Sequence, residues 1–494
     1  LCSNTTANCN VAVGYESLPA NTTGGNNSAL GFRSLCANTT GAANTAVGFC
    51  SLRSNTTADN NTAVGFCALS SSTTGTSLTA VGFCALSRNT TGSRNTAIGR
   101  RSNRCNTTAS CNTSVGDASL FANTTGASNT ALGLNAMLCS TTGSSNTAVG
   151  RHSLQCNTTA SNNTAVGTNS LQENTTGTDN TAVGHQSLFT NQTGANNVAI
   201  GKNSLYFNTA SNNTAVGQLA MTNTTTGSNN TAVGQNAFTT NTSGSQSVAI
   251  GVNSLDANTT GANNVAVGYH ALSKNTTANE NVAVGRCSMF ENTTGTFNVA
   301  VGNYSLDSNT TGACNVAIGY SASCTQTDAV CNTALGFKAL LSNTSNQNTG
   351  IGTTALQDAT TTFRSTAVGS AAGENTTTGA YQTYVGWSAG IANTTGFGNT
   401  VVGARAYCTG TTAGNNTAVG YLSLQLTTGG CNTGIGQSAL SNNTSGSDNT
   451  AIGDASGNTV TTGSNLTLLG HNAQPSSATA TNEITLGDAN VTTL

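Results

Sequence analysis

The chain has 494 residues, of which 6% are charged, and its net charge is −2. A nucleic-acid interface needs clustered Lys or Arg, whereas the 14 basic residues here are spread from Arg33 to Arg405, so we expect no nucleic-acid partner. No apolar run approaches the roughly 20 residues of a membrane span, so we expect no membrane insertion.

One unit, Asn-Thr-Ala-Val-Gly-x-x-Ser-Leu-x-x-Asn-Thr-Thr-Gly-x-x, repeats along almost the whole chain. The glycine of Ala-Val-Gly recurs at 29 landmarks from Gly14 to Gly487. Of the 28 intervals, 25 are 17 residues long and three are 16 residues long (201 to 217, 336 to 352 and 420 to 436). So regular a period predicts one small unit stacked on itself around a continuous core.

Each unit is numbered below from its landmark glycine as position 0. Position −1 is Val, Ile or Leu, −2 is mostly Ala, and +4 is usually Leu. We predict two short strands, Thr-Ala-Val and x-Ser-Leu, separated by a bend, with an Asn-Thr-Thr-Gly turn at +7 to +10. One such rung every ~4.8 Å predicts an all-β solenoid, or β-roll, with a shaft of roughly 130 Å. We expect the shaft to cover residues 1–470 and an irregular transition segment to cover residues 471–494.

Identical residues should lie over one another in such a stack. We expect apolar ladders at −1 and +4, an amide ladder from the Asn at −4, and loop deletions in the three short rungs. The Leu ladder weakens near the C-terminus, where other residues take position +4: Gly373, Gly390, Tyr407, Gly457 and Gln474. Tyr384 and Trp387 lie in this stretch, and we expect them to fill the resulting gap as core aromatics; a role in stacking on a ligand is the alternative.

The 16 cysteines recur in phase, either at one position of neighbouring rungs or on the two sides of one turn. Equivalent Cα atoms one rung apart lie within the separation that a disulfide allows. The disulfide candidates are Cys2, Cys9, Cys50, Cys67, Cys84, Cys105, Cys111, Cys139, Cys156, Cys314, Cys324 and Cys331. Such bonds, within or between chains, indicate an oxidising, extracellular setting. The alternative is buried free thiols. No His lies near a pair at zinc-like spacing, so we expect no metal.

Acceptor triplets Asn-x-Ser/Thr recur on the Asn-Thr-Thr turn. We expect this turn to be exposed, which makes N-linked glycans one interpretation, and good turn chemistry without sugar is the other. The glycosylation candidates are Asn4, Asn21, Asn38, Asn55, Asn89, Asn106, Asn123, Asn157, Asn174, Asn191, Asn223, Asn241, Asn258, Asn275, Asn292, Asn309, Asn343, Asn375, Asn393 and Asn443.

Apolar residues on both faces of a thin coil favour self-association. One face would pack inside the coil and the other against a partner chain, which the small Ala at −2 would allow to approach closely. Parallel association of three copies satisfies this pattern, and a single-chain solenoid is the alternative.

The Asn-Thr-Ala-Val-Gly-x-x-Ser-Leu unit resembles the head repeats of trimeric autotransporter adhesins of the YadA type and the shaft repeats of phage and large-virus tail fibres. The closing segment, Thr481 to Leu494, is similar to the stretch that precedes the self-cleaving trimerisation chaperone of tail spikes. The resemblance implies a homotrimeric left-handed β-roll.

These features lead us to expect the structural shaft of an extracellular or virion surface fibre that presents an adhesive tip. A glycan-binding adhesin that acts through its repeat loops is the alternative, with a host-surface glycan or receptor as partner. Ice binding is a minor alternative, because the Thr residues lie mostly on turns. We expect no enzymatic activity, since the histidines (His152, His185, His270 and His471) have no Ser, Asp or Cys partner in phase. We expect no cofactor other than N-linked glycans.

Overall fold

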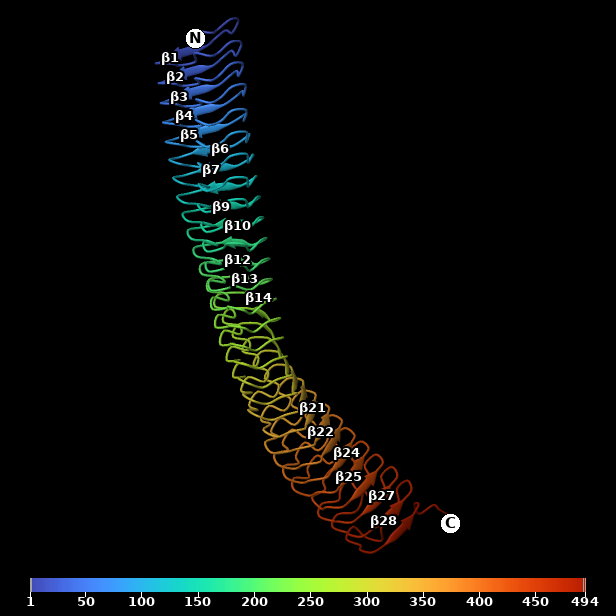
Figure 1. The fold of residues 1–494 in the computed structure, drawn as a ribbon. Coiled ribbons are helices and arrows are strands. Elements are labelled where there is room, and N and C mark those ends of the chain that lie inside the picture. Colours follow the sequence, from blue (N-terminus) through green and yellow to red (C-terminus); the bar gives the residue numbers. More distant parts are fainter. Residues whose placement is uncertain (1, 492, 494) are drawn as a thin grey trace. The chain divides into compact units, whose positions relative to one another are not determined.

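The computed structural model describes residues 2–491 and 493, and it divides into two compact units, Leu1–Gln246 and Ser247–Leu494. Each unit is a parallel β-solenoid to which every rung contributes one three-residue strand (Figure 1). The first unit contains β1 (Val11–Val13), β2 (Ser28–Leu30), β3 (Thr45–Val47), β4 (Thr62–Val64), β5 (Thr79–Val81), β6 (Thr96–Ile98), β7 (Thr113–Val115), β8 (Thr130–Leu132), β9 (Thr147–Val149), β10 (Thr164–Val166), β11 (Thr181–Val183), β12 (Val198–Ile200), β13 (Thr214–Val216) and β14 (Thr231–Val233).

The second unit contains β15 (Val248–Ile250), β16 (Val265–Val267), β17 (Val282–Val284), β18 (Val299–Val301), β19 (Val316–Ile318), β20 (Thr333–Leu335), β21 (Thr349–Ile351), β22 (Thr366–Val368), β23 (Thr383–Val385), β24 (Thr400–Val402), β25 (Thr417–Val419), β26 (Thr433–Ile435), β27 (Thr450–Ile452), β28 (Thr467–Leu469) and β29 (Ile484–Leu486). The predicted all-β repeat coil is thereby confirmed.

Register within each unit follows the repeat. Ala46 of β3 lies opposite Ala63 of β4, 17 residues later, and the pairing is parallel. Across a short rung the offset becomes 16, as between Val198 and Thr214. The Asn208 amide donates to the carbonyl two residues on, at Ala210, instead of three. The missing residue therefore lies in the turn, which confirms the predicted loop deletion.

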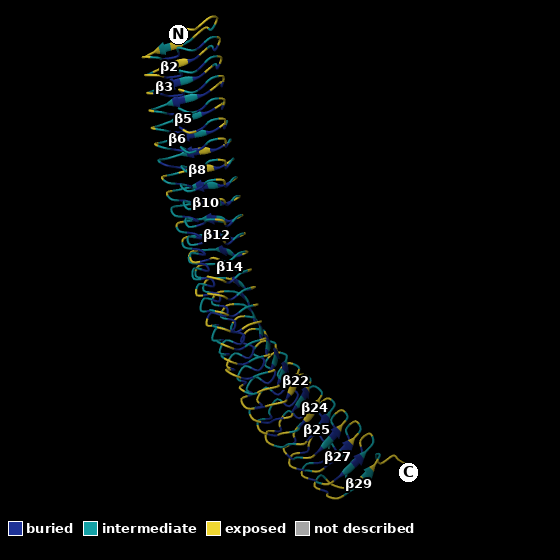
Figure 2. Cartoon of the chain, viewed as in Figure 1, coloured by how far each residue is buried: buried dark blue, intermediate teal, exposed yellow. Residues whose placement is uncertain are grey.

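The strand residues alternate between the inside and the outside of the coil. Ala at −2 points inward and is fully buried, as at Ala46 and Ala63, while the residues at −3 and −1 point outward and stay partly exposed. Figure 2 colours the coil by burial and shows buried, intermediate and exposed stretches within the rungs. Leu at +4, such as Leu52, completes the core. The expectation that Ala allows a partner to approach was wrong, because Ala lines the interior. The two apolar ladders exist, but only the +4 ladder is internal.

The predicted second strand, x-Ser-Leu, is a turn. Positions +2 and +4 adopt left-handed backbone conformations, with φ of 54° at Cys50 and 47° at Leu52. Their N–H groups still bond to neighbouring rungs, from Cys50 to the carbonyl of Phe32 (2.9 Å) and from Leu52 to that of Ala68 (3.0 Å). A left-handed Leu costs about 1–2 kcal/mol, and burying its side chain offsets that cost by a similar amount.

Both its positive φ and its close contact with the next rung require glycine at the landmark position. At Gly48 φ is +130°, and a Cβ there would lie 2.6 Å from the carbonyl oxygen of Gly65 in the next rung. Any side chain would push the rungs apart. The same contact with the next rung recurs at most landmark glycines, such as Gly14, Gly31 and Gly65, and it explains why Gly occupies the bend there.

Two amide ladders hold the turns together. The N–H of Asn44, at −4, donates to Oδ1 of Asn27 (2.9 Å), and Asn44 Nδ2 donates to the carbonyl of Ala58 (2.8 Å). This is the predicted −4 ladder. A second ladder runs through position +7, where Asn38 Nδ2 donates to Oδ1 of Asn21 (2.8 Å) and to the carbonyl of Gly41 (2.9 Å).

Tyr384 fills the gap left in the Leu ladder, as predicted. It occupies a −2 position and is fully buried. A Cβ on Gly373 would lie 2.5 Å from its ring, and one on Gly390 would lie 2.3 Å away. The ring therefore uses the space of two missing leucines. Trp387 does not share this role; it is 57% exposed, so the expectation that it lies in the core was wrong.

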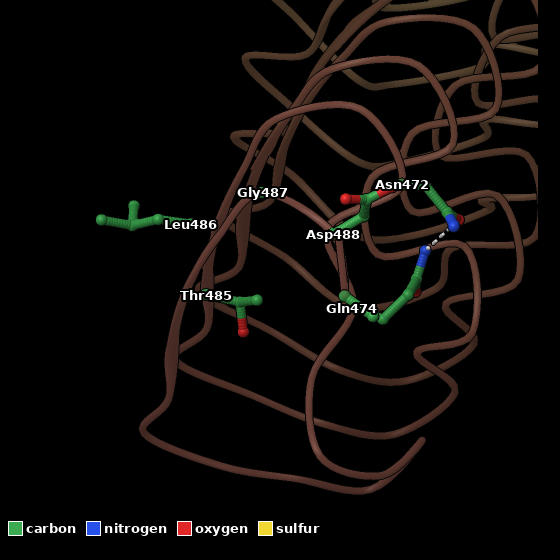
Figure 3. A pocket seen from close by; sticks show the side chains of 7 residues that line it. Asn472, Gln474, Thr485, Leu486, Gly487 and Asp488 are labelled. Carbon is green, nitrogen blue, oxygen red and sulfur yellow. Dashed lines mark hydrogen bonds between the residues drawn. The ribbon is translucent and has the colours of Figure 1, made fainter. Parts of the chain in front are cut away.

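The last strand, β29, keeps the same alternation. In Figure 3, Leu486 points away from the coil, while Thr485, at the −2 position, points inward. A recess of about 350 Å³ lies here, lined by Asn472, Gln474, Thr485, Leu486, Gly487, Asp488 and Ala489. It is the interior of the last rung and contains no paired acid and base.

Candidate interaction surface

The outward face of the strands carries no charge. Position −1 is Val, Ile or Leu in all 29 strands, and −3 is Thr, Val, Ser or Ile. These apolar side chains remain accessible in the single chain, with Leu30 at 50% and Leu132 at 46% exposure. A sheet face that is exposed to solvent normally carries polar and charged side chains. A long uncharged face is typical of a surface that something else covers.

An aromatic ladder lies beyond the bend, at position +1. Its rings are stacked at centroid separations of 5.0–5.4 Å, and both faces of each inner ring are covered by neighbouring rings. The inner rings leave only their edges free and so offer no open face for a flat ligand, whereas each of the two end rings has a ring partner on one face only. The members are Tyr15, Phe32, Phe49, Phe66 and Phe83.

Most of the glycosylation candidates are inside the coil. Seventeen of the 20 are fully buried: Asn21, Asn38, Asn55, Asn89, Asn106, Asn123, Asn157, Asn174, Asn191, Asn241, Asn258, Asn275, Asn292, Asn309, Asn343, Asn393 and Asn443. The Nδ2 group of each donates to the backbone carbonyl two or three residues on, as at Asn38 and Asn343, so a sugar on Nδ2 would remove a donor and need space that the core does not have. The expectation of exposed acceptors was wrong for these positions. The structure favours turn chemistry there, and only Asn4, Asn223 and Asn375 remain accessible.

A second set of acceptor triplets was missed because only one phase of the repeat was considered. These asparagines lie at −5, are exposed, and adopt positive φ at the corner before the strand. A search for every Asn-x-Ser/Thr would have found them. They are Asn26, Asn60, Asn162, Asn212, Asn229, Asn415 and Asn465.

The sixteen cysteines are all free thiols, so none of the expected disulfides is formed. Side chains in register keep their Cβ atoms about one rung, ~4.8 Å, apart, whereas a disulfide needs roughly 3.5–4.5 Å. The sequence argument used the Cα separation alone. Burial also raises the pKa of Cys67, Cys139 and Cys156, which keeps these thiols protonated and less reactive.

One histidine does have Ser and Asp partners, contrary to the expectation from the sequence. Ser273 Oγ donates to Asp256 Oδ1 (2.5 Å) and lies 3.2 Å from His270 Nδ1. Asn253 lies on the other side of the ring, 3.3 Å from Nε2. The serine is between the acid and the histidine and is only 5% exposed, whereas a nucleophilic serine must reach substrate and pass its proton to the histidine. The cluster is a structural network.

Charge is distributed unevenly between the units. The first unit has nine basic and five acidic residues, a net charge of +4, and the second has five basic and eleven acidic residues, a net charge of −6. Five of the eleven arginines fall between Arg88 and Arg104. Arg101 and Arg104 both lie over the ring of Phe121, at 5.8 and 5.9 Å.

Within the described residues, no group of three or more His, Cys, Asp or Glu side chains is placed to hold a metal ion. The same residues include no helix with the length and apolar character to cross a membrane. No protein-family model matches the chain, and no curated protein matches its sequence.

Proposed function

We propose that the chain is the shaft of an extracellular or virion surface fibre and that it assembles as a parallel homotrimer through its outward strand face. The observation that carries this proposal is the absence of any charged residue at −3 and −1 in 29 strands. The same rung repeated many times makes a spacer, and the sequence resemblance to adhesin heads and fibre shafts points the same way. An adhesive tip would be presented by the spacer.

The energetics favour association of a long stack. Covering a half-exposed Val or Leu contributes about 1 kcal/mol, half of what full burial gives. Six of the 14 side chains at −1 in the first unit are 37–54% exposed and the other eight are less exposed, so the 14 strands would contribute on the order of 10 kcal/mol per chain. The loss of translational and rotational freedom costs about 4–15 kcal/mol and is incurred once, whatever the number of rungs.

The solution mass of the full chain tests the proposal. A trimer has a mass of about 147 kDa, three times the 49.0 kDa of the chain. Replacing Val149, Val166 and Val183 with Asp should shift the mass toward that of one chain, because each unpaired charge would be buried at the interface. Thr142, Thr159 and Thr176 are exposed turn residues, and Asp at these positions is the matched control. A 49.0 kDa wild-type particle would overturn the trimer.

Ice binding is the second candidate function, and a column of threonines on the outward strand face favours it. Nine successive strands place Thr on the outward face at −3: Thr45, Thr62, Thr79, Thr96, Thr113, Thr130, Thr147, Thr164 and Thr181. The threonines are therefore not confined to turns. This function needs the face to be open, so it requires a monomer that inhibits ice recrystallisation, whereas the fibre proposal requires an assembled particle that does not.

A further inference from the structure

Trp387 is the only tryptophan of the chain and stands outside the core, 57% exposed. It lies at +1, the position of the aromatic ladder, but its neighbours in that column are Ser370 and Ala404. These small side chains cannot cover an indole. None of the ring pairs or cation–π contacts among the described residues includes it. The largest aromatic surface of the chain is therefore left open.

A recess of about 390 Å³ adjoins the indole and is lined by Trp387, Ser388, Ile391, Arg405, Cys408 and Thr409. Ligand sites usually measure about 300–1,000 Å³, so this one has the size for a small ligand. The N–H of Arg405 donates to the carbonyl of Trp387 (2.9 Å), which holds the two residues on adjacent rungs.

Two polar residues of the recess, Arg405 and Thr409, have hydrogen-bonding capacity left for a ligand. Arg405 is exposed, and the ion pairs of the described residues do not include it. Its planar guanidinium offers a fork of N–H donors. Thr409 Oγ1 donates to the carbonyl of Gln425 (2.8 Å), so its lone pairs remain to accept a hydrogen bond from a ligand. An open aromatic face thus lies beside one donor group and one acceptor.

We propose that this recess binds a glycan, with one pyranose ring stacked on Trp387 and its hydroxyl or carboxylate oxygens bonded to Arg405. A pyranose has an apolar C–H face that suits the indole and a rim of hydroxyl groups that suits Arg405 and Thr409. A cationic ligand is disfavoured by the adjacent guanidinium. Single-stranded nucleic acid is disfavoured because it needs a row of stacking rings along a positive groove, whereas this unit has a net charge of −6.

The inference does not depend on the number of chains or on the shaft assignment. Trp387 lies beyond the bend, not on the strand face assigned to the trimer contact. If the solution mass shows a single chain, the glycan-site proposal is unaffected. If no glycan binds, the shaft proposal is unaffected.

Because the chain has one tryptophan, the tryptophan fluorescence reports on this recess alone. The native full-length protein would be screened on an array of neutral and acidic oligosaccharides, and N-acetyllactosamine, sialyllactose and chitotriose would be titrated in solution. At least one probe should change the emission of Trp387. By calorimetry, Trp387→Ala should weaken that binding at least tenfold, Trp387→Phe should weaken it less, and Arg405→Met should weaken it about tenfold.

Tyr421 provides the matched control, since it is an exposed +1 aromatic outside the recess. Tyr421→Ala should leave the affinity unchanged within twofold. The proposal is overturned by an array with no binder, by binding that survives Trp387→Ala, or by an oligothymidine that binds more tightly than every sugar. Native emission that acrylamide cannot quench would overturn it too, because a partner would then cover the indole.

Discussion

Replacing Tyr384 with Ala should open the core of the second unit locally. The ring occupies the volume that leucines at +4 would fill in two rungs, where Gly373 and Gly390 have no side chain to move into the void. Removing a large buried aromatic costs about 3–5 kcal/mol, and poor relaxation places this site at the upper end. The hydrogen bond from Asn393 Nδ2 to the phenol oxygen (2.7 Å) is lost as well.

Hydrogen exchange read by mass spectrometry on peptides covering residues 366–400 is the suitable assay, because a repeat protein opens locally and not as one unit. A loss of 3–5 kcal/mol corresponds to exchange that is roughly 100- to 4,000-fold faster. Tyr381, three residues away and 52% exposed, is the control, and Tyr381→Ala should have little effect.

Rescue makes the test sharper. The triple variant Tyr384→Ala, Gly373→Leu and Gly390→Leu restores the common pattern, and φ at both glycines, +57° and +60°, is close to the value at which Leu occurs in other rungs. Protection should return. Gly373→Leu alone should destabilise, because its side chain would collide with the ring. If Tyr384→Ala leaves protection unchanged, or if the triple variant is worse than the single one, the packing argument fails.

Other predictions concern the core and its chemistry. Asn103 replaces Leu at +4 and is fully buried, and neither its amide nitrogen nor its amide oxygen has a hydrogen-bond partner. Asn103→Leu should therefore stabilise the first unit by about 2 kcal/mol, measured by thermal or denaturant unfolding. A destabilised variant would contradict this. Burial raises the pKa of Tyr407 to about 12, so its neutral form stabilises the fold below pH 10, and this contribution is lost as pH rises through 12. In an absorbance titration, two of the nine tyrosines, Tyr384 and Tyr407, should ionise last. Glycopeptide mapping after expression in an N-glycosylating host should find sugar at exposed acceptors such as Asn60 and Asn162, and sugar at Asn38 or Asn55 would refute the buried ladder. Thiol titration of the unfolded, unreduced chain should count 16 free thiols, and a lower count would show disulfides.

The repeat made the stack predictable, because the 17-residue period held to within one residue over 28 intervals and the landmark glycine fixed the bend. Gap filling by Tyr384 was also predictable, since a large residue appeared where Leu was missing from neighbouring rungs. The orientation of the strand was not, because Ala and Val are both apolar, and their alternation does not say which of them faces the core.

The turns were harder to predict, for a different reason. Leu52 adopts positive φ, which a branched side chain rarely does, so the x-Ser-Leu run was interpreted as a strand. Asn38 belongs to a turn motif that is usually exposed, yet a stacked amide satisfies its own neighbours and can be buried. Both features depend on contacts with the next rung, and such contacts cannot be deduced from the sequence of a single 17-residue repeat.

A cryo-electron microscopy reconstruction of the native particle would test most directly how the outward face is used. The proposal predicts parallel coils around a threefold axis, with Val149 and its equivalents turned toward the neighbouring copy and the alanines of −2 inside each coil. A lone coil whose Val, Ile and Leu column faces solvent, or one with those side chains in the interior, would contradict it.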